Sequence, residues 1–154
     1  MPAARVLILM GSKKDQGIME KSAKILEELK IPYRMEISSA HRDPERTKGL
    51  VQDAEKNGVK VIIAGAGMAA HLPGVVASYS RLPVIGVPLS ASSLQGLDSL
   101  LSIVQMPAGI PVATMSIDEA GAKNAAVLAA QILSLADDGI VKRLDKLRKD
   151  LAKR

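Results

Sequence analysis

The sequence predicts an α/β fold in which a parallel sheet lies between helices on both faces. Short apolar runs bounded by turn residues alternate strictly with segments whose apolar residues recur at helical spacing. Two of the runs, 83–87 and, apart from Lys60, 59–64, are apolar, which is typical of strands covered on both faces. Right-handed crossovers between such strands produce a doubly wound sheet, and we expect the flavodoxin-like strand order 2-1-3-4-5.

The predicted elements follow one another in a regular order. Strands are expected at residues 5–10, 33–37, 59–64, 83–87 and 111–115. Helices are expected at residues 15–30, 43–57, 69–80, 92–105 and 118–137. The helix at 43–57 has the clearest ends, because Asp43 is a good N-cap, Pro44 suits the first helical position and Asn57 precedes a glycine.

The length of 154 residues suits one domain, and the chain contains no internal repeat, linker or low-complexity segment. We assign residues 1–138 to a single α/β domain, which is the catalytic domain if the protein is an enzyme. Residues 139–154 form a separate basic amphipathic helix, whose narrow apolar stripe predicts packing on the domain or on a partner subunit. This segment has seven Lys or Arg residues and two Asp, so it carries the whole net charge of +5.

The composition excludes several classes of function. Without cysteine there is no disulfide, thiolate metal site or cysteine nucleophile, and the presence of only two histidines argues against a zinc site. Aromatic residues make up only 1% of the chain, which argues against a base-stacking nucleic-acid surface. The N-terminal apolar run is too short for a signal peptide or a membrane span. We therefore expect a cytoplasmic protein with no metal, nucleic-acid or membrane partner.

Candidate functional residues follow the first two predicted strands, where ligands bind in open parallel sheets. The first loop, MGSKKDQG, has Gly11 for close backbone approach, Ser12 as a donor and Asp15 as a helix cap or a sugar ligand. The second, SSAHRDP, places Arg42 across from Ser12 if the two strands are neighbours. Together these groups suit a phosphate, although a capped helix with solvated lysines has the same pattern. His41 suits proton transfer, since histidine both gives and takes protons near neutral pH; a plain surface histidine is the alternative.

The loop after the third strand contains GAGMAA, which fits the G-x-G-x-x-A pattern of dinucleotide-binding proteins. That interpretation requires an acidic residue about 20 positions further on, and no Asp or Glu lies between Glu55 and Asp98. The remaining interpretation is a small, dry cavity walled by small apolar residues and ending at His71, or simple close packing of helix on sheet. The residues therefore predict a phosphorylated small molecule, histidine acid–base chemistry, and no metal or nucleotide cofactor.

Four motifs in unbroken order, MGSKKD, SSAHRDP, AGAGMAAHLPG and GLDSLLSIVQMPAGIPVATM, resemble the bacterial N5-carboxyaminoimidazole ribonucleotide mutases of purine biosynthesis. This family is also known as the catalytic subunit of phosphoribosylaminoimidazole carboxylase, and the resemblance covers residues 5 to 135. It implies a three-layer α/β/α sandwich assembled as a homo-octamer. It also implies an isomerase that moves a carboxylate from the exocyclic nitrogen to ring carbon 4, without ATP, metal or organic cofactor.

The resemblance implies a role for each matching residue. His41 would be the catalytic acid–base residue, Asp15 would bind the ribose, and the segment QMPAGIP (105–111) would close over the site. The phosphate would be held by Ser12, Ser39 and Arg42. The pocket that retains carbon dioxide would be lined by Gly67, Ala70 and His71.

This chain departs from the family pattern at Lys14, Gln16 and Met68, where the family usually has Ser, an aromatic residue and Gly. A carboxylase branch that uses free carbon dioxide is the main alternative. That branch has Lys after the histidine and GRSN in the third loop, so Arg42 and GAGMAAH favour the mutase. A catalytically silent ribonucleotide-binding relative is the second alternative, which the intact His41 argues against.

Overall fold

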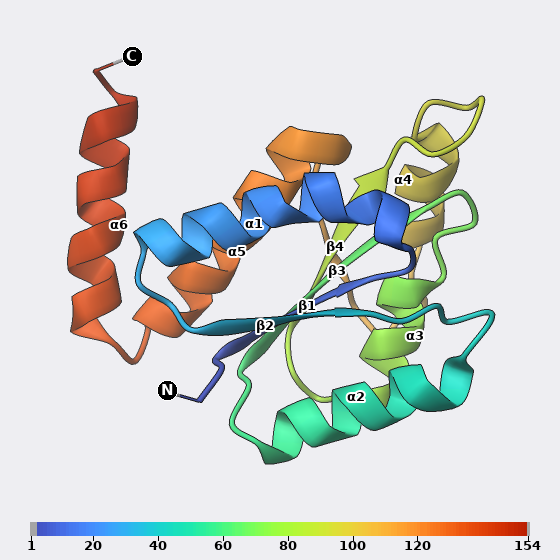
Figure 1. Ribbon diagram of the computed structural model, residues 1–154. Coiled ribbons are helices and arrows are strands. Elements are labelled where there is room, and N and C mark those ends of the chain that lie inside the picture. Colours follow the sequence, from blue (N-terminus) through green and yellow to red (C-terminus); the bar gives the residue numbers. More distant parts are fainter. Residues whose placement is uncertain (1–2, 154) are drawn as a thin grey trace.

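The computed structural model describes residues 3–153 and contains the predicted α/β fold (Figure 1). The five strands are all parallel and run in the order β2-β1-β3-β4-β5, which confirms the predicted order. The strands are β1 (Val6–Met10), β2 (Tyr33–Ile37), β3 (Val61–Gly67), β4 (Val84–Leu89) and β5 (Ala113–Thr114). The helices are the short 3-10 helix η1 (Lys13–Asp15), α1 (Gln16–Glu28), α2 (Pro44–Lys56), α3 (Leu72–Tyr79), α4 (Leu97–Val104), α5 (Asp118–Ser134) and α6 (Asp138–Leu151).

Two apolar clusters, one on each face of the sheet, hold the layers together. On one face α1 and α5 cover β1, β3 and β4, and on the other α2, α3 and Ile103 of α4 cover the same strands (Figure 1). The strands β1 and β4 are buried along their whole length, because every residue in them meets a helix layer. After β2 the chain returns past β1 and forms β3 on the other side of β1. The direction in which strands are added to the sheet therefore reverses between β1 and β3, and the carboxyl ends of these two strands adjoin there.

Several predicted elements differ from the structure at their ends; for example, the strand expected over 59–64 is β3 (Val61–Gly67), and the helix expected over 118–137 ends at Ser134. The helix expected from 69 begins at Leu72, because Met68 and Ala70 adopt left-handed backbone conformations that a helix does not contain. The helix expected from 92 begins at Leu97 for the same reason, since Gln95 and Gly96 have positive φ. The last strand, expected over 111–115, contains two residues at the edge of the sheet.

The last helix, α6, lies at the far end of the molecule from the carboxyl ends of the strands (Figure 1). Its residues Ile140 and Leu144 are buried among residues of the cluster under α1 and α5. Arg143 donates a hydrogen bond of 2.6 Å from Nε to the carbonyl oxygen of Leu29, which satisfies an orphan carbonyl at the end of α1. Leu151 lies on the same stripe as Ile140 and Leu144 but is exposed, and the opposite face of α6 is exposed as well.

Candidate active site

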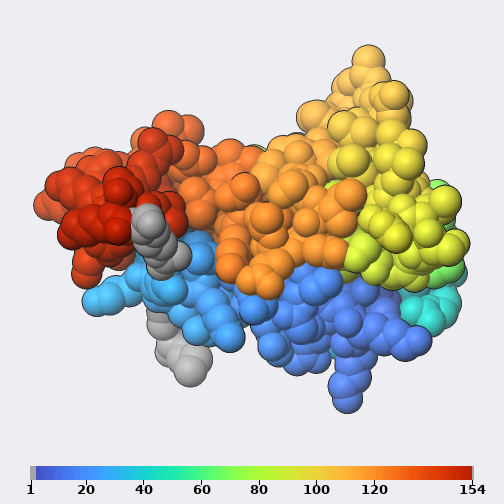
Figure 2. All heavy atoms as spheres, turned by 90° about the horizontal axis from the view of Figure 1, so that it is seen from above, coloured from blue at the N-terminus to red at the C-terminus, as the bar shows by residue number. Residues whose placement is uncertain are grey.

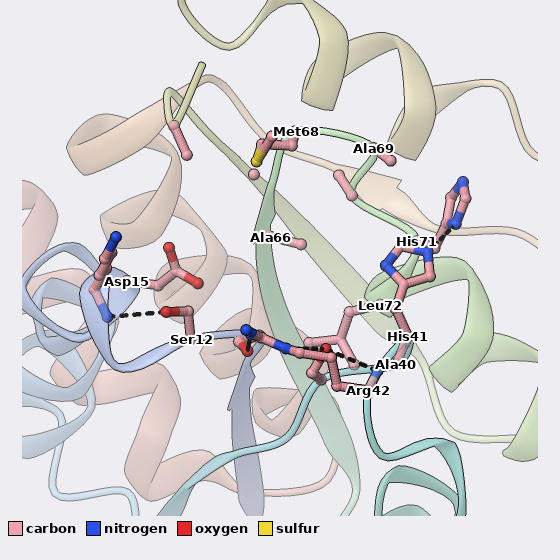
Figure 3. A pocket seen from close by; sticks show the side chains of 16 residues that line it. Ser12, Asp15, Ala40, His41, Arg42, Ala66, Met68, Ala69, His71 and Leu72 are labelled. Carbon is pink, nitrogen blue, oxygen red and sulfur yellow. Dashed lines mark hydrogen bonds between the residues drawn. The ribbon is translucent and has the colours of Figure 1, made fainter.

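A cavity of about 550 Å³ opens at the carboxyl ends of the strands, between the loops that follow β1, β2, β3 and β4 (Figure 3). All nine residues singled out from the sequence line it. They are Gly11, Ser12, Asp15, Ser39, His41, Arg42, Gly67, Ala70 and His71. Ser12 and Asp15 lie on one side of the cavity and His41 and His71 on the other, with Arg42 between the two groups (Figure 3). The fold thus brings these residues together, while their roles stay predictions.

The first loop leaves an acidic side chain at the cavity. Ser12 adopts an extended conformation and its Oγ accepts a hydrogen bond of 3.2 Å from the amide of Lys14, so Ser12 caps η1. Asp15 occupies the N-cap position of α1 but its side chain makes no capping hydrogen bond. Of the two alternatives for Asp15, the structure shows the N-cap position but no side-chain cap, because the 3-10 turn before α1 is capped by Ser12 instead. The carboxylate of Asp15 stays available to a ligand in the cavity.

The environment of Asp15 makes its carboxyl group a weaker acid than an exposed aspartic acid. Burial raises the pKa of its carboxyl group above the ordinary value of 3.8, while a backbone hydrogen bond at Ser12 and the positive charge of Arg42 lower it less. A half-buried carboxyl group of this kind gains from hydroxyl groups that a ligand brings, since these replace the lost water. This chemistry is compatible with the ribose contact that the resemblance implies.

The second loop is anchored so that His41 and Arg42 face the cavity. Asp43 caps α2 by accepting a hydrogen bond from the amide of Arg46. At the other end of the loop, the buried hydroxyl groups of Ser38 and Thr47 form a hydrogen bond of 2.8 Å. The residues between these two anchors therefore have little freedom to move away from the end of the sheet.

Arg42 connects the second loop to the first. Its Nε and its backbone amide both lie 3.3 Å from Oγ of Ser39, and its Nη2 donates to the carbonyl oxygen of Gly11 at 3.3 Å. The contact with Gly11 exists because β1 and β2 are neighbours in the sheet. Lys14 also lines the cavity, so the positively charged side chains there are Lys14 and Arg42 and the negatively charged one is Asp15. The charges and donors of the first two loops therefore suit an anion.

The two histidines of the chain form a hydrogen-bonded pair, which sequence reasoning did not find. Nε2 of His41 lies 2.5 Å from Nδ1 of His71, and the rings meet edge to face with centroids 4.6 Å apart. This hydrogen bond requires a proton on one of the two nitrogens and a lone pair on the other. The pair can therefore pass one proton between its rings. The only signal in the sequence was that both histidines follow a strand at the same edge of the sheet.

The third loop forms the apolar wall of the cavity. The left-handed residues Met68 and Ala70 turn the chain sharply, and the amide of Ala70 donates to the carbonyl oxygen of Gly67 at 3.0 Å. Gly67 has no room for a side chain, since an added Cβ would lie 2.5 Å from Cβ of Ala91. Ala91 comes from the loop after β4, and it too lines the cavity.

Several lining residues were not singled out from the sequence. These are Ala40, Leu72 and Ala91. They are apolar, and isolated apolar residues give no chemical signal of a site. Lys14 and Met68, named above as departures from the family pattern, also line the cavity, as do Ala66 and Ala69 of the predicted apolar loop. Conversely, the segment 105–111, expected to close over the site, does not line this cavity. The chain between α4 and β5 instead projects from the body of the molecule (Figure 2).

Within residues 3–153, no three His, Asp or Glu side chains gather into a group that would hold a metal ion. In the same part of the chain, no helix combines the length and the apolar character needed to cross a bilayer.

Comparison with known proteins places the chain in a family. The model of the AIR carboxylase family matches residues 5–154. N5-carboxyaminoimidazole ribonucleotide mutase of Haemophilus influenzae is 52% identical over 96% of this chain and 90% of that protein. The mutase of the same name from Pyrococcus abyssi is 55% identical, with 96% and 83% covered. Among solved structures, Treponema denticola PurE superposes with a TM-score of 0.87 at 34% identity, covering 96% of this chain and 91% of that one. The chain therefore belongs to the AIR carboxylase family.

Proposed function

We propose that this protein is an N5-carboxyaminoimidazole ribonucleotide mutase, an isomerase that forms 4-carboxyaminoimidazole ribonucleotide in the biosynthesis of IMP. The observation that carries the proposal is one cavity in which His41 stands beside charges and donors that suit an anion and beside an apolar wall. The relatives of that name, 52–55% identical along nearly the whole chain, support the same activity.

The proposed orientation of the substrate follows from the charges in the cavity. The phosphate binds at Ser12, Ser39 and Arg42, with Gly11 allowing close approach of the backbone, and Lys14 adds a second cation beside it. The ribose hydroxyl groups bind the carboxylate of Asp15. This places the imidazole ring toward the third loop, next to His41, because the histidines lie across the cavity from Asp15 (Figure 3).

The reaction transfers one carboxylate and needs no net change in protons. The bond between the exocyclic nitrogen and the carboxyl carbon breaks, the electron pair stays on nitrogen, and carbon dioxide is released. The nitrogen takes up a proton, ring carbon 4 attacks the carbon dioxide, and the proton on that carbon is then removed. One histidine can give the first proton and accept the second. We assign this role to His41, with His71 as its hydrogen-bond partner.

The apolar wall suits the retention of carbon dioxide. Gly67, Ala70 and Ala91 offer few polar groups that would bind water next to the ring. A molecule released in such a place stays near the attacking carbon, which replaces a bimolecular encounter by an intramolecular one. A carboxylase that recruits carbon dioxide from solution has less need of this enclosure.

The activity is tested by adding N5-carboxyaminoimidazole ribonucleotide to the purified protein without ATP or added metal. Formation of 4-carboxyaminoimidazole ribonucleotide, followed by its absorbance and by mass-resolved chromatography, is the expected result. An unchanged rate of spontaneous decarboxylation, with no ring-carboxylated product, contradicts the proposal and supports the catalytically silent alternative.

We further propose that the chain assembles as a homo-octamer. Four exposed apolar residues lie along one side of α4 and the turn before it, namely Leu94, Leu97, Leu101 and Val104. A surface of this kind is typical of subunit interfaces. Residues 1–138 would then be the catalytic domain and α6 an addition to it, since none of the residues of α6 lines the cavity. The cytoplasmic location stays a prediction.

A further inference from the structure

An unusual backbone conformation marks the first residue of α5. Asp118 has a φ of 60°, in the left-handed region that non-glycine residues enter at a cost in free energy. The turn that precedes it is tight, because a Cβ added to Gly121 would lie 1.6 Å from the carbonyl oxygen of Ser116. A glycine at 118 would adopt this conformation without strain. The presence of aspartate there therefore points to a use for its side chain.

The carboxylate of Asp118 holds the loop that follows β4. The backbone amide of Ser90 donates to Oδ1 of Asp118 at 2.8 Å, and the hydroxyl group of Ser90 donates to Oδ2. Beside this contact, Gly96 packs closely on Ile117, since an added Cβ would lie 2.7 Å from Cγ2 of Ile117. Residues 90–96 are thus fixed at both ends to the start of α5, which lies next to the end of β4 (Figure 1).

The loop held in this way supplies part of the cavity wall. Ala91 directly follows Ser90, lines the cavity and touches Gly67 at the end of β3. The other Ser–Asp contact of the loop, between Ser92 and Asp98, joins the loop to α4 and leaves α5 untouched. Of the hydrogen bonds seen within residues 3–153, those from Ser90 to Asp118 are therefore the ones that tie this wall to α5.

We propose that Asp118 is a positioning residue of the active site, which keeps Ala91 against Gly67 and so keeps the cavity closed to water on that side. The inference rests on the proposed mutase function, in which released carbon dioxide must stay beside the ring. When the contact is lost, carbon dioxide escapes before ring carbon 4 attacks it. The nitrogen has already taken its proton, so aminoimidazole ribonucleotide and free carbon dioxide accumulate in place of the ring-carboxylated product.

The test compares Asp118→Gly, which relieves the backbone strain and removes both hydrogen bonds, with Asp118→Asn, which tolerates the same φ and can still bind Ser90. Lys30→Gly is the matched control, because Lys30 also has a positive φ, of 52°, but lies away from the cavity. The measurements are kcat, KM and the fraction of consumed substrate that ends as aminoimidazole ribonucleotide.

We expect Asp118→Gly to lower kcat about tenfold with KM within about twofold, and to raise the uncoupled fraction, since the phosphate loops are untouched while the wall is displaced. Asp118→Asn and Lys30→Gly should behave as the unaltered protein. A loss of kcat in Asp118→Gly without a larger uncoupled fraction, or an unaltered kcat, overturns the proposal.

A second measurement separates this proposal from the proposed function. Hydrogen exchange of the amides of residues 89–96, without any ligand, should be faster in Asp118→Gly than in the unaltered protein and unchanged in Lys30→Gly. If the unaltered protein does not isomerise the substrate, the proposed function fails while this comparison still decides whether Asp118 holds the loop. Equal exchange in all three proteins overturns that part as well.

Discussion

Replacing Gly67 by alanine tests whether the third and fourth loops form one tight wall. The added Cβ would lie 2.5 Å from Cβ of Ala91 and 3.2 Å from the carbonyl oxygen of Leu89. Nonbonded carbon atoms ordinarily stay about 3.5–4.0 Å apart. The loop that carries Ala91 must therefore withdraw by about 1 Å, which opens the cavity at the place where carbon dioxide would be held.

The size of the effect follows from two opposed contributions. Overfilling a packed site costs about 1–3 kcal/mol. Alanine also lowers the conformational entropy of the unfolded chain, which stabilises the folded state by about 0.4–1 kcal/mol. The free energy of unfolding should therefore fall by roughly 1–2 kcal/mol, and the melting temperature by roughly 2–8 °C for a chain of this size. Gly49→Ala is the control, since no atom lies within 4 Å of its added Cβ in α2, and it should melt slightly higher.

The assay combines thermal unfolding followed by circular dichroism with steady-state conversion of the substrate. Gly67→Ala should lose kcat about tenfold or more, because small displacements near reacting groups have large effects on rate. KM should change little, since the phosphate-binding loops are not disturbed. A variant with the melting temperature and turnover of the unaltered protein would refute the tight contact between Gly67 and Ala91.

Three further predictions concern the acid–base residue, the buried carboxyl group and the assembly. His41→Asn should keep the fold and ligand binding but lose turnover by roughly 10²-fold or more, and near-normal turnover would remove His41 from the mechanism. Asp15→Asn should unfold at the same or a higher temperature at pH 7, because the buried Asp15 is ionised there at a cost that the unfolded chain does not have. This difference should shrink as the pH falls through the raised pKa of Asp15 toward 3.8, whereas a difference that grows on acidification would contradict the effect of burial. Light scattering at micromolar concentration should give the mass of an octamer, and Leu101→Glu should reduce it; a monomer in the unaltered protein would contradict the proposed assembly.

Much of the architecture was predictable because it depends on local patterns and general rules. The alternation of elements and the handedness of crossovers predicted a doubly wound parallel sheet, and the order 2-1-3-4-5 was the one favoured among those that such sheets adopt. The nine candidate residues meet in one cavity for the same reason, since each follows a strand and the carboxyl ends of parallel strands share an edge.

The parts that were missed depend on contacts between residues far apart in the sequence. Nothing local to Ser90 indicates its contact with Asp118, and nothing local to His41 indicates its hydrogen bond to His71. The late start of α3 comes from the left-handed conformation of Met68, a residue whose side chain does not favour it. The cap at Ser12 was not predicted, and Asp15 was considered as a cap instead, because a 3-10 turn before a helix has no clear sequence pattern.

The most direct test of the proposed activity follows the transferred carbon itself. N5-carboxyaminoimidazole ribonucleotide with a ¹³C-labelled carboxylate is incubated with the protein in unlabelled bicarbonate, without ATP or added metal, and the product is analysed by mass spectrometry. The mutase mechanism, with carbon dioxide held between His41 and the wall at Gly67, predicts that nearly all of the label appears in the carboxylate on ring carbon 4. Unlabelled product formed from medium bicarbonate and bare aminoimidazole ribonucleotide, with the nitrogen carboxylate ignored, would contradict the mutase and support the carboxylase.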